Sequence, residues 1–127
     1  MHKGPAIRKD MAIIAIKRAY DPPSRADGAR ILVDRLWPRG IRKHQLQVKQ
    51  WMREIGPSSE LRRFFGHDPA RWDEFRKRYL RELKRTETAN LLAELIEIAR
   101  KGRLTLIYSA KDEEHNQAVI LKQLLEA

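Results

Sequence analysis

The sequence predicts a small α/β domain with an open, mostly parallel sheet of about three strands flanked by helices. Three short apolar runs, suited to buried strands, lie at residues 13–17, 30–34 and 103–108. The second run is almost continuously apolar, which is typical of a strand covered on both faces. Segments with helical spacing separate the second run from the third, and such crossovers favour parallel pairing with right-handed connections.

Loops follow the first two runs. After the first, the two prolines next to Asp21 force an extended or turning backbone. After the second, Pro38 and Gly40 enforce a loop. The apolar positions of residues 43–55 fit a helix only in part, so a strand near residues 48–52 is the alternative.

Capping residues mark the next two helices. Ser58 is the expected N-cap of a short helix that ends at Gly66. Asp68 and Pro69 then have the pattern of an N-cap followed by a first-turn proline. The helix after them carries an apolar stripe that is typical of a core-facing surface. That stripe consists of Trp72, Phe75, Tyr79, Leu80 and Leu83.

Two further helices complete the predicted fold. One spans about residues 88–100, with Gly102 as its C-cap. The other follows the third apolar run, and Asp112 is its expected N-cap. The residues expected to be buried in this last helix are Ala118, Leu121, Leu124 and Leu125.

Length and composition limit the classes of protein to which this chain can belong. The 127 residues suffice for one domain with a modest core. The first ten residues show no periodicity and resemble a tag scar or an upstream extension, so we assign a single domain to residues 11–127. No apolar run approaches the roughly 18 residues that span a bilayer, which predicts a soluble, cytoplasmic protein without a membrane partner. The absence of cysteine excludes disulfides, thiolate catalysis and cysteine-ligated metal sites.

The charge is strongly basic and unevenly distributed. The formal net charge is +10, and residues 1–85 carry 22 basic and 10 acidic side chains. Arginine supplies 17 of the 27 cations, and its planar fork matches carboxylate and phosphate oxygens. The bias therefore favours oxyanion recognition, although a coding bias with solvated arginines explains it equally well. A chain with this charge is also expected to bind nucleic acid weakly.

The predicted topology places candidate site residues at one rim. Ligands of open parallel sheets bind beyond the carboxyl ends of the strands, where residues 20–24, 34–40 and 109–116 would form three loops. The candidate acid–base residues in these loops are Asp34, Asp112 and His115. The candidate ligand-binding residues, which include one from the turn before Pro69, are Tyr20, Asp21, Arg35, Trp37, Arg39, His67 and Asn116.

Most of these residues also have a structural explanation. The structural alternatives are an Asx-type turn at Asp21, an ion pair of Asp34 with Arg35 or Arg39, core closure by Trp37, helix capping by Asp112 and packing of His115. Asp112 and His115 are also a potential pair of ligands for a divalent cation. No P-loop, GxGxxG or HExxH motif is present, so the sequence names no cofactor.

Three functions are compatible with these features, and one of them, a protein–protein adaptor, would require an exposed apolar patch of several hundred Å² that the sequence does not reveal. The favoured one is binding of a small anionic ligand at the rim, either alone or with acid–base catalysis. Because three carboxylates occupy the expected start of the last helix, the anion is better placed against Arg35 and Arg39. The alternative is binding of a nucleic-acid backbone by an arginine face over residues 71–85. Glu74 interrupts that face, and its spacing of four residues to Arg78 favours a surface of exposed salt bridges instead.

Three sequence blocks carry a resemblance to a known family. LVDRLWPRG at residues 32–40, FGHDP at residues 65–69 and DEEHN at residues 112–116 resemble the YeaO-like branch of a bacterial family, domain of unknown function 488. The resemblance implies a small single α/β domain and supplies no activity. The family pattern favours alanine where this chain has Gly56. Longer relatives look as though they carry a Cys-His-Arg element at residues 114–116, which implies a shared site with altered chemistry.

Overall fold

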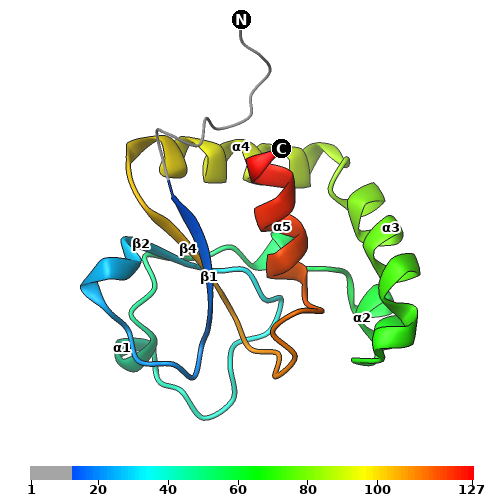
Figure 1. Ribbon diagram of the computed structural model, residues 1–127, viewed down its shortest axis with the longest axis horizontal. Helices are drawn as coiled ribbons and strands as arrows, with labels where there is room; N and C mark the ends of the chain where they lie inside the picture. Colours follow the sequence, from blue (N-terminus) through cyan, green and yellow to red (C-terminus); the bar gives the residue numbers. More distant parts are fainter. Residues whose placement is uncertain (1–12) are drawn as a thin grey trace, which may run out of the picture.

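The computed structural model describes residues 13–127 and confirms an α/β fold with an open, all-parallel sheet (Figure 1). Four strands, rather than about three, form the sheet in the order β1-β4-β2-β3. Their bounds are Ile14–Arg18 for β1, Ala29–Leu32 for β2, Gln50–Trp51 for β3 and Leu104–Tyr108 for β4. The additional strand, β3, is the alternative that the sequence offers near residues 48–52. The predicted extension over residues 1–10 lies outside the described residues.

Strand β4 lies between β1 and β2 and is buried along its whole length. Leu106 is the register partner of Ile16 on one side and of Ile31 on the other. Successive side chains of a strand point to opposite faces of the sheet. Accordingly, Leu106 belongs to the main core, whereas its neighbour Ile107 belongs to a smaller cluster on the opposite face.

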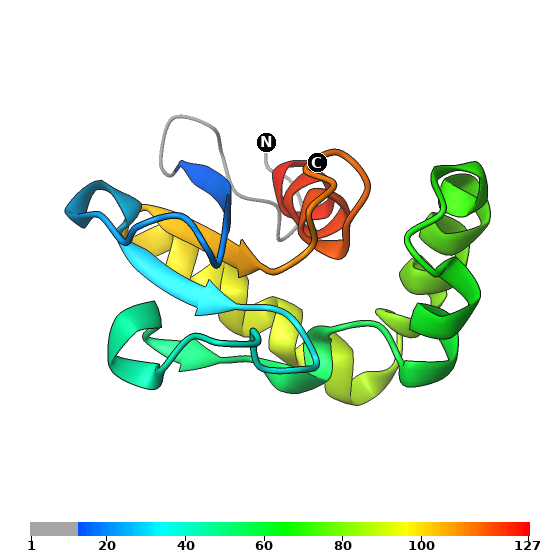
Figure 2. The same ribbon diagram turned by 90° about the horizontal axis from the view of Figure 1, so that it is seen from below.

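Four α-helices within the described residues contribute buried side chains to the main core. They are α2 (Ser59–Phe65), α3 (Trp72–Glu82), α4 (Thr86–Lys101) and α5 (Gln117–Glu126). Helix α5 packs on β1 and β4, and it also contacts α3. Figure 2 shows the strands at one end of the molecule and α3 at the other.

The predicted caps of α2 are confirmed. The Ser58 hydroxyl oxygen accepts a hydrogen bond from the Leu61 backbone N–H at 3.1 Å. Gly66 ends the helix in the left-handed region, with a φ of 53°. Both signals depend on residues within one turn of each other, which is why the sequence predicts them correctly.

The predicted cap of α5 is wrong. Asn116, and not Asp112, is the N-cap, and its Oδ1 accepts a hydrogen bond from the Val119 backbone N–H at 3.1 Å. Asp112 caps an earlier turn instead, so His115 precedes the helix and does not occupy its third position. Leu124, expected to be buried, is 38% exposed, because it lies on the outer side of α5.

Loops, not long helices, cover the opposite face of the sheet. The connection from β1 to β2 contains the short 3₁₀ helix Arg25–Asp27, and the connection from β2 to β3 contains α1 (Lys43–Leu46). The small cluster beneath them consists of Ala19, Leu32, Leu46 and Ile107, with Trp37, Ile41, Val48 and Trp51 packed against it.

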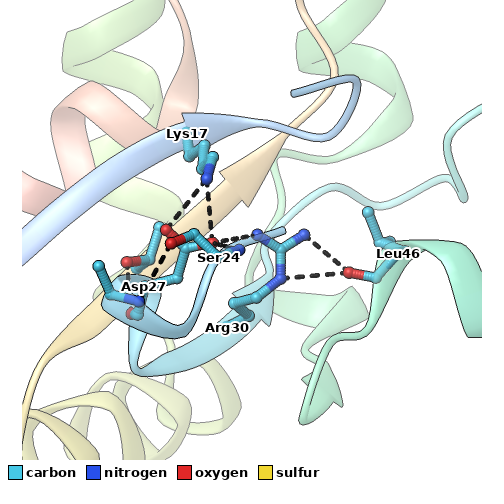
Figure 3. Close-up of polar contacts among 7 residues, drawn as sticks. Lys17, Ser24, Asp27, Arg30 and Leu46 are labelled. Atoms are coloured by element: carbon cyan, nitrogen blue, oxygen red, sulfur yellow. Dashed lines mark hydrogen bonds and ion pairs between the residues drawn. The ribbon is translucent and has the colours of Figure 1, made fainter. Parts of the chain in front are cut away.

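A buried charge network ties these loops to the sheet (Figure 3). The Asp27 carboxylate accepts hydrogen bonds from Arg30 at 2.7 Å and from Lys17 at 3.1 Å. The Arg30 guanidinium also donates to the carbonyl oxygen of Leu46 at 2.7 Å. Arg30 is therefore a charged residue within a buried strand, and its partners compensate for the loss of water.

Candidate functional site

A groove of about 940 Å³ lies at the carboxyl ends of the strands, beside the loops that follow β2 and β4. It is lined by nine of the ten predicted site residues, namely Tyr20, Asp34, Arg35, Trp37, Arg39, His67, Asp112, His115 and Asn116. The tenth, Asp21, is exposed and does not line the groove. Residues separated by as many as 96 positions therefore meet at one edge of the sheet, since parallel neighbouring strands end together.

Asp34 follows β2 and joins three elements. Its Oδ2 accepts a hydrogen bond from the Ser109 backbone N–H at 3.0 Å, and its Oδ1 accepts one from the side-chain amide of Gln117. Burial raises the pKa of Asp34, while the Ser109 side chain, the two hydrogen bonds above and the charge of Arg62 partly offset that effect. The predicted ion pair of Asp34 with Arg35 or Arg39 is absent among the described residues.

Arg35 is engaged with the backbone. Its Nε donates to the carbonyl oxygen of Pro57 and its second terminal nitrogen donates to that of Gly56, both at 2.9 Å. These two bonds hold the segment before α2 against the loop after β2. Arg35 therefore positions one wall of the groove, and only part of its guanidinium stays free for a ligand.

Asp112 and His115 form a close pair. The distance between Asp112 Oδ2 and His115 Nδ1 is 2.8 Å, and the other carboxylate oxygen accepts the backbone N–H groups of Glu114 and His115. The backbone N–H of Glu114 and the side chain of His115 lower the pKa of Asp112. The imidazole also packs edge-on against Trp72, with ring centroids 5.2 Å apart. Within residues 13–127, His115 Nε2 has no hydrogen-bond partner.

Besides Arg35, three cations line the groove. Arg39 comes from the loop after β2, Arg62 from α2 and Lys111 from the loop after β4. None of them forms an ion pair with a carboxylate in the part of the chain that the structure describes. Sequence reasoning missed Arg62 and Lys111, because nothing in their local sequence distinguishes them from the other exposed cations.

Three further residues of the predicted site have structural contacts. Trp37 donates its indole N–H to the carbonyl oxygen of Ile41 at 2.6 Å and packs in the small cluster, as its structural alternative predicts. The Tyr20 hydroxyl donates to the carbonyl oxygen of Arg39 at 2.9 Å. Asn116 is buried and uses both side-chain atoms within its own turn. These residues shape the groove.

His67 and Asp21 differ in their relation to the groove. His67 has a left-handed φ of 57°, is exposed and lines the groove near the ring of Phe65. Asp21 makes no side-chain hydrogen bond within the described region, so neither a ligand-binding role nor the alternative Asx-type turn receives support there. The potential metal pair, Asp112 and His115, has no third histidine or carboxylate ligand nearby among residues 13–127.

Comparison with known proteins places the chain in a family. The family model described as "Inactive DUF488-N3 subclade" matches residues 13–127. The chain belongs to this DUF488 subclade. Its relatives include uncharacterized protein YeaO of Escherichia coli, 47% identical over 112 residues, which are 88% of this chain and 96% of the relative. They also include uncharacterized protein Rv3073c of Mycobacterium tuberculosis and uncharacterized protein Mb3100c of Mycobacterium bovis, each 38% identical over 112 residues, 88% of this chain and 92% of the relative.

The groove of this DUF488 member is built from the blocks that carry the resemblance. Asp34 and Arg39 come from the first block, His67 from the second and His115 from the third. No solved structure matches the chain at a significant level. None of the helices within the described residues combines the length and apolarity needed to cross a membrane.

Proposed function

We propose that this protein binds a small anionic ligand in the groove at the carboxyl ends of its strands. The observation that carries the proposal is the convergence of Arg39, Arg62 and Lys111 on one groove without a carboxylate partner among the described residues. Four cationic side chains line the groove against two carboxylates. The carboxylates of Asp34 and Asp112 already accept hydrogen bonds from the protein, so the cations stay available to an oxyanion.

Binding without catalysis is the favoured form of this function. The chain belongs to a subclade whose description is inactive, and it contains no cysteine. The second candidate is acid–base catalysis by Asp34, Asp112 and His115, which the 2.8 Å contact between Asp112 and the imidazole favours. A bound ligand that is recovered unchanged after prolonged incubation supports binding alone.

Thermal unfolding in the presence of anions tests the proposal. Phosphate and sulfate, compared with chloride at equal ionic strength, are expected to raise the Tm of the wild-type protein, because a ligand that binds the native state stabilises it. Arg62→Ala is expected to abolish this increase. The matched control is Arg63→Ala, since Arg63 is exposed on the same helix and does not line the groove. Equal losses in both variants would show that the effect is general charge screening.

The nucleic-acid alternative rests on the arginines of α3 and the turn before it. Arg78 and Arg71 lie over the ring of Phe64, at 4.2 Å and 5.5 Å from its centroid. Arg78 is paired with Glu74 at 2.8 Å, and Arg71 donates to the carbonyl oxygen of Phe64. These contacts make the arginines less available to phosphate groups. Binding that falls steeply with salt and disappears on charge reversal at Arg78 would favour this alternative.

A further inference from the structure

The groove contains both charges, because the Asp34 carboxylate lies among its cationic side chains. Asp34 accepts hydrogen bonds from two neutral donors, the Ser109 backbone N–H and the Gln117 amide, and the neutral side chain of Ser109 also lowers its pKa. A carboxylate has about four lone-pair sites, so part of its acceptor capacity is unused by these contacts. Arg62 is near enough to affect the pKa of Asp34 but does not form an ion pair with it.

This arrangement favours an anion that carries a hydroxyl group over a bare anion. An oxyanion placed against Arg62 would be repelled by the neighbouring Asp34 carboxylate. A ligand that also directs an O–H group at Asp34 converts the repulsion into a charge-assisted hydrogen bond. The volume of about 940 Å³ leaves space for a body larger than a phosphate, and the apolar walls include Leu36, Pro57 and Phe65.

The excess of cationic side chains in the groove favours a hydroxyl group over an ammonium group as the ligand's donor to Asp34. An ammonium group at Asp34 would lie among four cationic side chains, whereas a hydroxyl group donates the same kind of hydrogen bond without a charge. The second carboxylate, Asp112, is engaged with His115 and does not offset those cations for a ligand. Three cations from three separate segments suit the several oxygens of a phosphate group.

We propose that the ligand is a phosphate ester of a hydroxyl-bearing body, of the sugar phosphate class. Its phosphate lies against Arg39, Arg62 and Lys111, and one of its hydroxyl groups donates to Asp34. This inference rests on the proposed function, since it specifies the class of anion that the same groove binds.

Isothermal titration of the full chain with four probes tests the inference. Ribose 5-phosphate is expected to bind at least about ten-fold more tightly than methyl phosphate, because a hydrogen bond to a charged group has about that effect. Phosphoethanolamine is expected to bind no more tightly than methyl phosphate, and ribose alone is expected not to bind measurably. Equal affinities for ribose 5-phosphate and methyl phosphate would overturn the inference while leaving the proposed function intact. Tightest binding of phosphoethanolamine would overturn it in favour of an ammonium ligand.

The variant Asp34→Asn tests whether the preference for ribose 5-phosphate depends on Asp34. Asp34→Asn is expected to lower the affinity for ribose 5-phosphate about ten-fold and to leave the affinity for methyl phosphate unchanged or higher, because the repulsion is removed. Methyl phosphate binding by the variant also shows that its groove is folded. An unchanged preference for ribose 5-phosphate in Asp34→Asn would contradict the assigned contact. Absence of binding by every phosphate probe to the wild-type protein would refute the proposed function itself.

Discussion

The Asp34 carboxylate accepts a hydrogen bond from the backbone N–H of Ser109 at 3.0 Å, and this contact joins the ends of β2 and β4. The two residues are 75 positions apart in the chain. The same carboxylate also binds the side chain of Gln117 at the start of α5. Asp34 thus connects both loops of the groove to the helix behind them.

The pH dependence of stability is expected to change in Asp34→Asn. Because burial raises the pKa of Asp34 above 3.8, the native state holds this proton more tightly than the unfolded state does. The contribution of Asp34 to stability is therefore fully present below pH 3.8 and is lost as the pH rises through the raised pKa. Urea unfolding between about pH 4 and pH 7 should show that wild-type stability falls relative to Asp34→Asn as the pH rises. A difference that grows in the opposite direction would contradict this assignment.

Removal of the Asp27 side chain is expected to destabilise the protein strongly. In Asp27→Ala, the guanidinium of Arg30, which is only 5% exposed, loses its carboxylate partner. Breaking a buried pair in this way costs about 3–5 kcal/mol in the free energy of unfolding. The control is Glu74→Ala, which removes the exposed partner of Arg78 and should cost much less. Similar urea midpoints for the two variants would show that the buried network contributes no more than a surface pair.

Gly56→Ala is expected to be destabilising. A Cβ atom there would lie 2.8 Å from the Arg35 backbone nitrogen and 3.2 Å from the Val33 carbonyl oxygen. Overpacking of this kind costs about 1–3 kcal/mol. Gly102→Ala is the matched control, since no atom lies within 4 Å of its added Cβ. Thermal unfolding compares the two, and equal Tm values would mean that the loop after β2 shifts freely to accept the methyl group.

Ser109→Ala is expected to leave stability nearly unchanged, within about 0.5 kcal/mol. The Ser109 hydroxyl oxygen is buried and forms no hydrogen bond of standard geometry in the described part of the chain, although the Ser109 side chain is near enough to Asp34 to lower its pKa. Tyr79→Phe provides the comparison, because the buried Tyr79 hydroxyl donates to the Ile55 carbonyl oxygen at 2.6 Å. Loss of that bond should cost about 1–3 kcal/mol, since an acceptor is left unpaired. A loss in Ser109→Ala as large as that in Tyr79→Phe would reveal a partner for the serine hydroxyl.

The N-cap of α5 is not determined by the local sequence alone. Asp112 and Asn116 are both competent N-caps and lie four residues apart. The sequence favours Asp112, but the helix begins after Asn116, whose side chain is buried beneath the preceding turn. Two residues of similar capping chemistry differ only in their surroundings, so the choice between them depends on packing.

The sequence alone determined the family, the three long strands and the caps of α2, because these features depend on residues close together in the chain. It also determined that polar loops follow β1, β2 and β4. Only the tertiary structure decided that β4 separates β1 from β2 and that Arg62 joins Arg39 and Lys111 at one groove. Those relationships come from long-range strand pairing and helix packing. They bring together side chains that are far apart in the chain, and the local sequence around each side chain does not indicate which residues it will contact.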